Sequence, residues 1–89
     1  MKAVVTVTGK DRQGIIAKVS AFLAEKGANI EDISQTILGE YFAMIMMVDI
    51  SSATEELATL AKECAELGKQ IGMAIYMQHE DIFNAMHNV

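Results

Sequence analysis

Residues 41–50 form a strand-like stretch that is apolar on both of its faces, and this stretch constrains the fold more than any other part of the chain. Side chains of a β-strand alternate between its two faces. One face would carry Tyr41, Ala43, Ile45 and Met47, and the other Phe42, Met44, Met46, Val48 and Ile50. A sheet that contains this strand therefore needs cover on both faces, because apolar surface is unfavourable in water.

The remaining elements can be placed around this strand. Val- and Thr-rich or alternating patterns predict further strands over residues 2–8, 28–38 and 73–78. Apolar side chains at helical spacing predict a helix over 15–26 that ends at Gly27, and Gly39-Glu40 is typical of a tight hairpin turn. A second helix carries one apolar stripe made of Leu57, Leu60, Cys64, Leu67 and Ile71. Ser52 and Glu55 fit a capping box at its start, and a short last helix is expected over 80–88.

The order strand, helix, strand, strand, helix, strand predicts an α+β chain with the ferredoxin-like βαββαβ sandwich. Right-handed crossovers put both helices on one face of a four-stranded antiparallel sheet, with the first and third strands in the centre. We expect one domain over residues 1–89, with a core at 1–79 and a C-terminal helical extension at 80–89.

The second face of the sheet predicts a partner subunit. A last helix of nine residues spans only about 14 Å, which is too short to cover a sheet. The chain is also 52% hydrophobic, which is more apolar material than one small core needs. We therefore expect a homodimer or higher homo-oligomer, with the last helix and a second copy sharing the cover.

Charge and cysteine content exclude several classes of function. A net charge of −5 without a basic run disfavours nucleic acid as a direct partner. No apolar run approaches a membrane span, and the N-terminus does not resemble a signal peptide, so a cytoplasmic protein is expected.

The single cysteine, Cys64, lies on an apolar stripe and is interpreted as structural. His79 and His87 are eight residues apart, which is not the spacing of a metal pair, and we expect no metal and no cofactor.

The loop over residues 9–14 is the best candidate for a binding site, whereas no catalytic motif is present and an enzyme is not expected. The loop joins a central strand to the start of a helix, where free N–H groups suit a carboxylate or phosphate. Gly14 allows a ligand to approach the backbone closely. Asp11 could accept a ligand's amino group or cap the helix, and Arg12 could pair with an anion.

Two segments of the sequence together resemble the ACT domain. They are Asp11-Arg12-Gln13-Gly14-Ile15 and the stretch Gly27-Ala28-Asn29-Ile30-Glu31-Asp32-Ile33. The extension after residue 79 is similar to that of a small stand-alone ACT family of bacteria and archaea. The resemblance implies a regulatory module that senses an amino acid or another small metabolite at a dimer interface. Carried over to this chain, it implies ligand contacts from Asp11, Gly14 and Ile15, with Asn29 and Ile30 from the second strand.

Other functions on the same topology remain possible at this point. The strongest alternative is an oligomerisation or adaptor module that binds no ligand. An acylphosphatase could use Arg12 and Asn29, but the loop lacks a glycine-rich phosphate cradle. An RNA-binding module would need a basic surface, which the composition does not provide.

Overall fold

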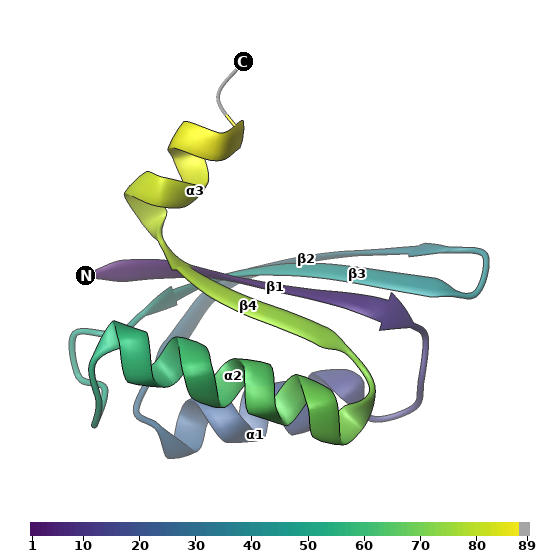
Figure 1. Ribbon diagram of the computed structural model, residues 1–89, viewed down its shortest axis with the longest axis horizontal. Helices are drawn as coiled ribbons and strands as arrows, with labels where there is room; N and C mark the ends of the chain where they lie inside the picture. Colours follow the sequence, from purple (N-terminus) through teal and green to yellow (C-terminus); the bar gives the residue numbers. More distant parts are fainter. Residues whose placement is uncertain (88–89) are drawn as a thin grey trace.

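The structure, a computed structural model, describes residues 1–87 and contains the seven expected elements (Figure 1). They are β1 (Lys2–Lys10), α1 (Ile15–Glu25), β2 (Asn29–Leu38), β3 (Tyr41–Asp49), α2 (Leu57–Ile71), β4 (Ala74–His79) and α3 (Glu80–His87). The predicted end of the last helix at Asn88 lies outside the described residues. The strand order is β2-β3-β1-β4, and every neighbouring pair is antiparallel. The predicted ferredoxin-like fold, with the first and third strands in the centre, is confirmed.

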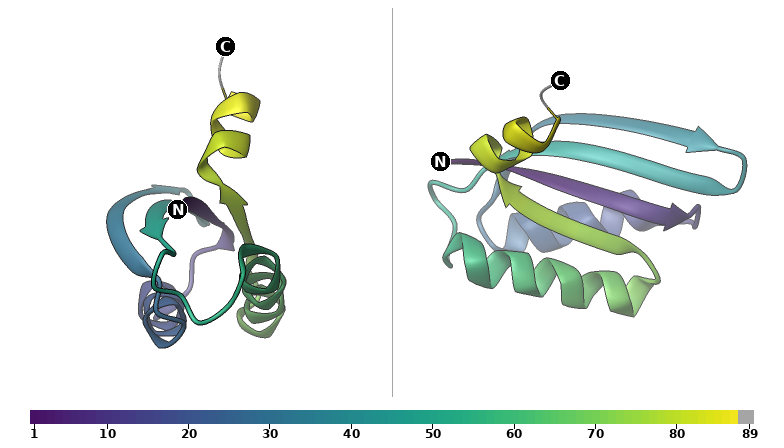
Figure 2. Two further views of the ribbon diagram at one scale, coloured as in Figure 1. Left: turned by 90° about the vertical axis from the view of Figure 1, so that its left-hand side faces the viewer. Right: turned by 45° about the horizontal axis from the view of Figure 1, so that its top comes forward.

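Helices α1 and α2 cover one face of the sheet over β1, β3 and β4. The two helices lie side by side beneath the sheet, whereas α3 stands on the opposite side (Figures 1 and 2). In β1, β3 and β4 the apolar side chains that point toward α1 and α2 are buried, and they are Ala3, Val5, Val7, Phe42, Met44, Met46, Val48, Ile75 and Met77. On the same side of β2, Ile33 and Ile37 are 42% and 57% exposed. Ile15, Val19 and Leu23 of α1 and Leu60 and Cys64 of α2 complete this core. The predicted helical stripes therefore face the sheet as expected.

The end of α1 follows from Gly27, as predicted. Gly27 has a φ of 76°, a left-handed conformation in which glycine has no Cβ to clash. Its N–H donates to the Ala24 carbonyl, and the Ala28 N–H donates to the Leu23 carbonyl. These two bonds form a Schellman motif, which satisfies carbonyls that the helix would otherwise leave unpaired.

The predicted capping box at Ser52 and Glu55 is wrong. Helix α2 begins only at Leu57, after the N-cap residue Glu56, and has no side-chain cap. Glu55 instead lies 3.3 Å from the Lys26 Nζ, which also contacts Glu63 of α2 at 2.9 Å. The Thr54 N–H donates to the Lys26 carbonyl. The segment before α2 is thus held against the end of α1. The side-chain hydrogen bonds from Lys26 to Glu63 and Glu55 raise the pKa of Lys26.

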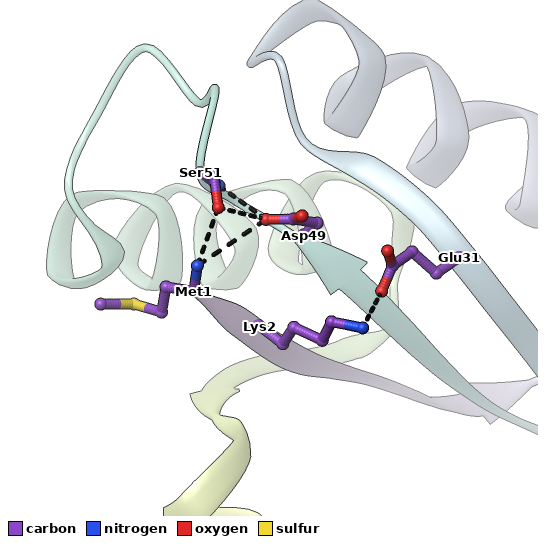
Figure 3. A network of polar contacts seen from close by, with 5 residues as sticks. All are labelled: Met1, Lys2, Glu31, Asp49 and Ser51. Atoms are coloured by element: carbon purple, nitrogen blue, oxygen red, sulfur yellow. Dashed lines mark hydrogen bonds and ion pairs between the residues drawn. The ribbon is translucent and has the colours of Figure 1, made fainter.

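A polar network closes the end of the sheet where β1 begins (Figure 3). The Ser51 hydroxyl and N–H donate to the Asp49 carboxylate at 2.6 and 2.9 Å, and both bonds lower the pKa of Asp49. The register of β2 against β3 shifts between Ile30 and Asp32, and the residue at this bulge, Glu31, lies 2.8 Å from the Lys2 Nζ. These contacts join the three strands β1, β3 and β2 at one end.

The close approach of α2 to β4 depends on Gly68. A Cβ at this position would lie 2.5 Å from the Met73 carbonyl oxygen and 3.2 Å from the Ile75 nitrogen. We expect Gly68→Ala to lower the free energy of unfolding by roughly 1–3 kcal/mol, because backbone atoms must shift. This loss would occur although alanine favours helices over glycine. Urea unfolding measures the effect, Lys69→Ala at the next, exposed position is the control, and an equally stable Gly68→Ala protein would contradict the packing described.

The Asp49 carboxylate is expected to make stability depend on pH in the acid range. Its folded pKa lies below the ordinary value, so its contribution is complete above the unfolded pKa of about 3.9 and is lost as the pH falls through the folded pKa. The difference in unfolding free energy between the parent protein and Asp49→Asn should therefore shrink as the pH is lowered from 6 toward about 3. Urea unfolding across this range measures it, with Glu25→Gln as an exposed control, and a constant difference would contradict the ionic origin.

Candidate binding cleft at the start of α1

The loop after β1 forms one wall of a cleft of about 210 Å³. Four of the six residues proposed from sequence lie together along it, namely Asp11, Arg12, Gly14 and Ile15. The opposite wall comes from the end of β2 and the start of β3, and it consists of Gln35, Ile37 and Phe42. The volume is below the range of about 300–1,000 Å³ that is typical for drug-sized ligands, so the cleft suits a small metabolite.

The start of α1 presents uncapped N–H groups to this cleft. Gly14 is the N-cap residue with a φ of 85°, no side chain accepts a hydrogen bond from the first turn, and that turn contains no acidic residue. The N-terminal end of a helix carries a partial positive charge. A Cβ at Gly14 would meet no atom within 4 Å, so the space beside this backbone is open. The cleft therefore offers an anion both hydrogen-bond donors and room.

Asp11 does not cap the helix, which was one of the two roles that the sequence left open. Its N–H donates to the Glu40 carbonyl at 2.7 Å, and this bond ties the loop to the β2–β3 turn. Within residues 1–87 its carboxylate makes no hydrogen bond or ion pair. A carboxylate in this state can accept the ammonium group of a ligand.

Arg12 has a structural contact in addition to its place along the cleft. Its guanidinium packs against Gly72, where a Cβ would lie 3.1 Å from the Arg12 Cζ. Gly72 is the C-cap of α2, and the carbonyl end of a helix attracts a cation. The side chain thus spans from the cleft to the junction of α2 with β4.

Asn29 and Ile30 do not reach this cleft within one chain. Asn29 pairs with Asp49 at the far end of the sheet, whereas Ile37 pairs with Phe42 beside the cleft. Eight residues of extended strand separate Asn29 from Ile37, which corresponds to about 26 Å. Sequence reasoning chose the first residues of this strand and missed Gln35 and Ile37 near its end. The two-residue turn at 39–40 fixes the register of the β2–β3 hairpin. This register could have identified Gln35 and Ile37 as residues beside the cleft.

The hollow between α1 and α2 and the possible metal ligands offer less for binding. A hollow of about 240 Å³ lies between α1 and α2, but the lysine in it, Lys26, is already paired with Glu55 and Glu63. In the part of the chain that the structure describes, no three His, Cys, Asp or Glu side chains gather as metal ligands. No helix within residues 1–87 is long and apolar enough to span a membrane.

The fold and the cleft define a class of protein: a ferredoxin-like sandwich with a candidate ligand site where its first loop meets its first helix. The chain belongs to the ACT domain family, whose model matches residues 2–78. A UPF0237 protein of Methanocaldococcus jannaschii is 53% identical over 88 residues, which are 99% of this chain and 98% of that protein.

The solved structures that are similar to this one include an ACT domain protein and a regulatory subunit. An ACT domain protein from Streptococcus pneumoniae has a TM-score of 0.83 and 45% identity, and the match covers 98% of each chain. The regulatory subunit of aspartate kinase from Thermus thermophilus, in its ligand-free form, has a TM-score of 0.65 and 29% identity, over 86% of this chain and 50% of that one. The match to the streptococcal protein includes the end of the chain beyond the ACT core.

Cys64 is expected to be chemically inert in the folded protein. It is buried in the α2 stripe, and this burial raises the pKa of its thiol to about 11. Only the thiolate reacts readily, so the native protein at pH 8 should label with a thiol reagent far more slowly than the urea-unfolded chain. Mass spectrometry of iodoacetamide-treated samples measures this, and rapid labelling of the native state would show that the site opens.

Proposed function

We propose that this protein is a regulatory module that binds a small zwitterionic metabolite, an amino acid, in the cleft at the start of α1, and that it acts as a cytoplasmic homodimer without enzymatic activity. The single observation that carries the proposal is the pairing of uncapped helix N–H groups with the free Asp11 carboxylate. The first group suits a ligand carboxylate and the second suits a ligand ammonium.

The apolar wall of the cleft supports the same class of ligand. Ile16, Ile37 and Phe42 line it beside the polar groups, and Gln35 adds one amide. A few fixed polar groups on an apolar background are typical of small-molecule sites. ACT domains are regulatory modules, and the similarity to the regulatory subunit of an aspartate kinase agrees with amino-acid sensing.

A thermal-shift screen against the twenty amino acids at millimolar concentration tests the proposal. A ligand that binds only the folded state stabilises it by about 2.7 kcal/mol at one hundred times its Kd, so at least one amino acid should raise the Tm. Its N-acetyl derivative and its amide should each lose the effect, because each removes one of the two charges that the cleft recognises.

Gly14→Ala is expected to abolish this ligand-induced shift. The new methyl group would occupy the open space beside the helix N–H groups, and the φ of 85° would cost about 1–2 kcal/mol of stability. Gly39→Ala is a matched control, because Gly39 also has a positive φ (62°) and open space but lies in the β2–β3 turn. Both variants should lose similar stability, and only Gly14→Ala should lose binding. Equal ligand affinity in the two variants would contradict the site.

The alternative function is an oligomerisation or adaptor module that binds no ligand. The observation that favours it is the exposed apolar surface on the side of the sheet away from α1 and α2. A homodimer whose Tm is unchanged by every amino acid would support this alternative over the sensor.

A further inference from the structure

The face of the sheet opposite α1 and α2, here called the open face, carries one charged side chain between the ends of its strands, Asp32 of β2, which lies in the row of Met47. Three strands, β1, β3 and β4, contribute the side chains Thr6, Thr8, Tyr41, Ala43, Ile45, Met47, Ala74, Tyr76 and Gln78. The register places Ile45, Thr6 and Tyr76 in one row across the sheet. Ile45 is 47% exposed and Tyr76 is 62% exposed. Contiguous exposed apolar surface of this kind marks an interaction site.

Helix α3 covers only one end of the open face. Val4 is buried where Phe83 lies over the start of the sheet. Ile82 and Met86 remain more than half exposed, although the Met86 sulfur accepts a hydrogen bond from the Gln78 amide at 3.5 Å. These two residues are one turn apart and lie on the same side of the helix. Eight helical residues span about 12 Å, against about 30 Å for the nine residues of β1. Figure 2 shows α3 standing away from the sheet near the N-terminus, while the β2–β3 hairpin extends at the other end.

The uncovered end of the open face contains an apolar hollow of about 290 Å³. Its lining includes Leu38, Tyr41 and Ala43 near the hairpin, together with Thr8 of β1. Leu38 is 76% exposed, so a large apolar side chain at this hollow faces solvent. Helix α3 and the β2–β3 hairpin beside this hollow lie at opposite ends of the molecule (Figure 1), so α3 does not reach the hollow of its own chain.

A two-fold axis brings these two features together. In an isologous dimer the same patch on each copy contacts the other, so α3 of each copy can reach the hollow of its partner when the sheets stack with opposite strand directions. The charges agree with this arrangement. Lys10 lies opposite Tyr41 at the hairpin end and has no ion pair within the described residues, and α3 begins with Glu80 and Asp81.

We propose that the open face binds a second copy of this chain, sheet against sheet, with α3 of each copy lying over the hairpin end of the other. Three strands about 30 Å long and the shorter β4, of about 20 Å, lie about 4.8 Å apart and give roughly 550 Å² per copy before α3 is added, or about 1,100 Å² in total. A specific interface needs about 1,000 Å². The inference rests on the homodimer of the proposed function and assigns the surface that forms it.

Crosslinking between two differently tagged copies tests the arrangement. Met86→Cys in one copy and Leu38→Cys in the other should give a covalent heterodimer with a short bismaleimide. The buried Cys64 does not compete. Met86→Cys with Ile33→Cys is the control, because Ile33 is opposite Met46 and points to the helix side of β2. Crosslinking of the control pair in place of the test pair would overturn the proposed stack.

Sedimentation of Ile45→Lys gives an independent test. Ile45 lies in the middle of the open face and is already half exposed, so the folded monomer should tolerate a lysine that the interface cannot bury unpaired. We expect this variant to be monomeric at micromolar concentration with an unchanged circular dichroism spectrum, whereas Ile33→Lys should remain dimeric.

The outcomes separate this inference from the proposed function. A dimer that persists in Ile45→Lys and dissociates in Ile33→Lys would overturn the stacked arrangement but leave the homodimer, with the β2 edge as its surface. A monomeric parent protein would overturn both. A stacked dimer that shows no thermal shift with any amino acid would support the stack and overturn amino-acid sensing alone.

Discussion

The pairing of β1 with β3 holds the molecule together, because these two strands provide the sheet surface against which both long helices pack. On that surface Val5 and Val7 of β1 and Met44, Met46 and Val48 of β3 are almost completely buried. Burial of one such side chain contributes about 1.5–3 kcal/mol, which no surface contact in this structure can match. The outer strands β2 and β4 each add to this pair from one side.

The candidate cleft depends on the same pair of strands. The loop that forms it leaves the end of β1 and is fixed at three points. Gly9 approaches Met73 so closely that a Cβ would lie 2.8 Å from its sulfur, Arg12 packs against Gly72, and the Asp11 N–H bonds to Glu40. A loop held in this way needs little ordering when a ligand binds, which favours affinity. Its contacts also connect the cleft to the α2–β4 junction and to the hairpin.

The cleft and the open face lie back to back at the hairpin end of the sheet. Phe42 lines the cleft and also borders the hollow on the other side, between Tyr41 and Ala43 of the open face. Both faces of β3 are apolar: one packs in the core, and the other forms part of the open face. In the proposed function, the ligand and the partner copy therefore lie on the two sides of this strand.

The sequence by itself determined the element order, the central position of β1 and β3, the end of α1 at Gly27 and the loop that carries Asp11, Arg12, Gly14 and Ile15. These features follow from local periodicity and from glycine, which act over a few residues. Tertiary contacts decided the rest. The capping box at Ser52 and Glu55 did not form, because Lys26 from a distant helix holds Glu55. Asn29 and Ile30 lie far from the loop, and Gln35 and Ile37 take their place, because strand register sets which end of β2 meets the cleft. The two apolar faces of residues 41–50 were visible in the sequence, but only the three-dimensional arrangement showed that α3 covers one end of the second face and leaves the other end open.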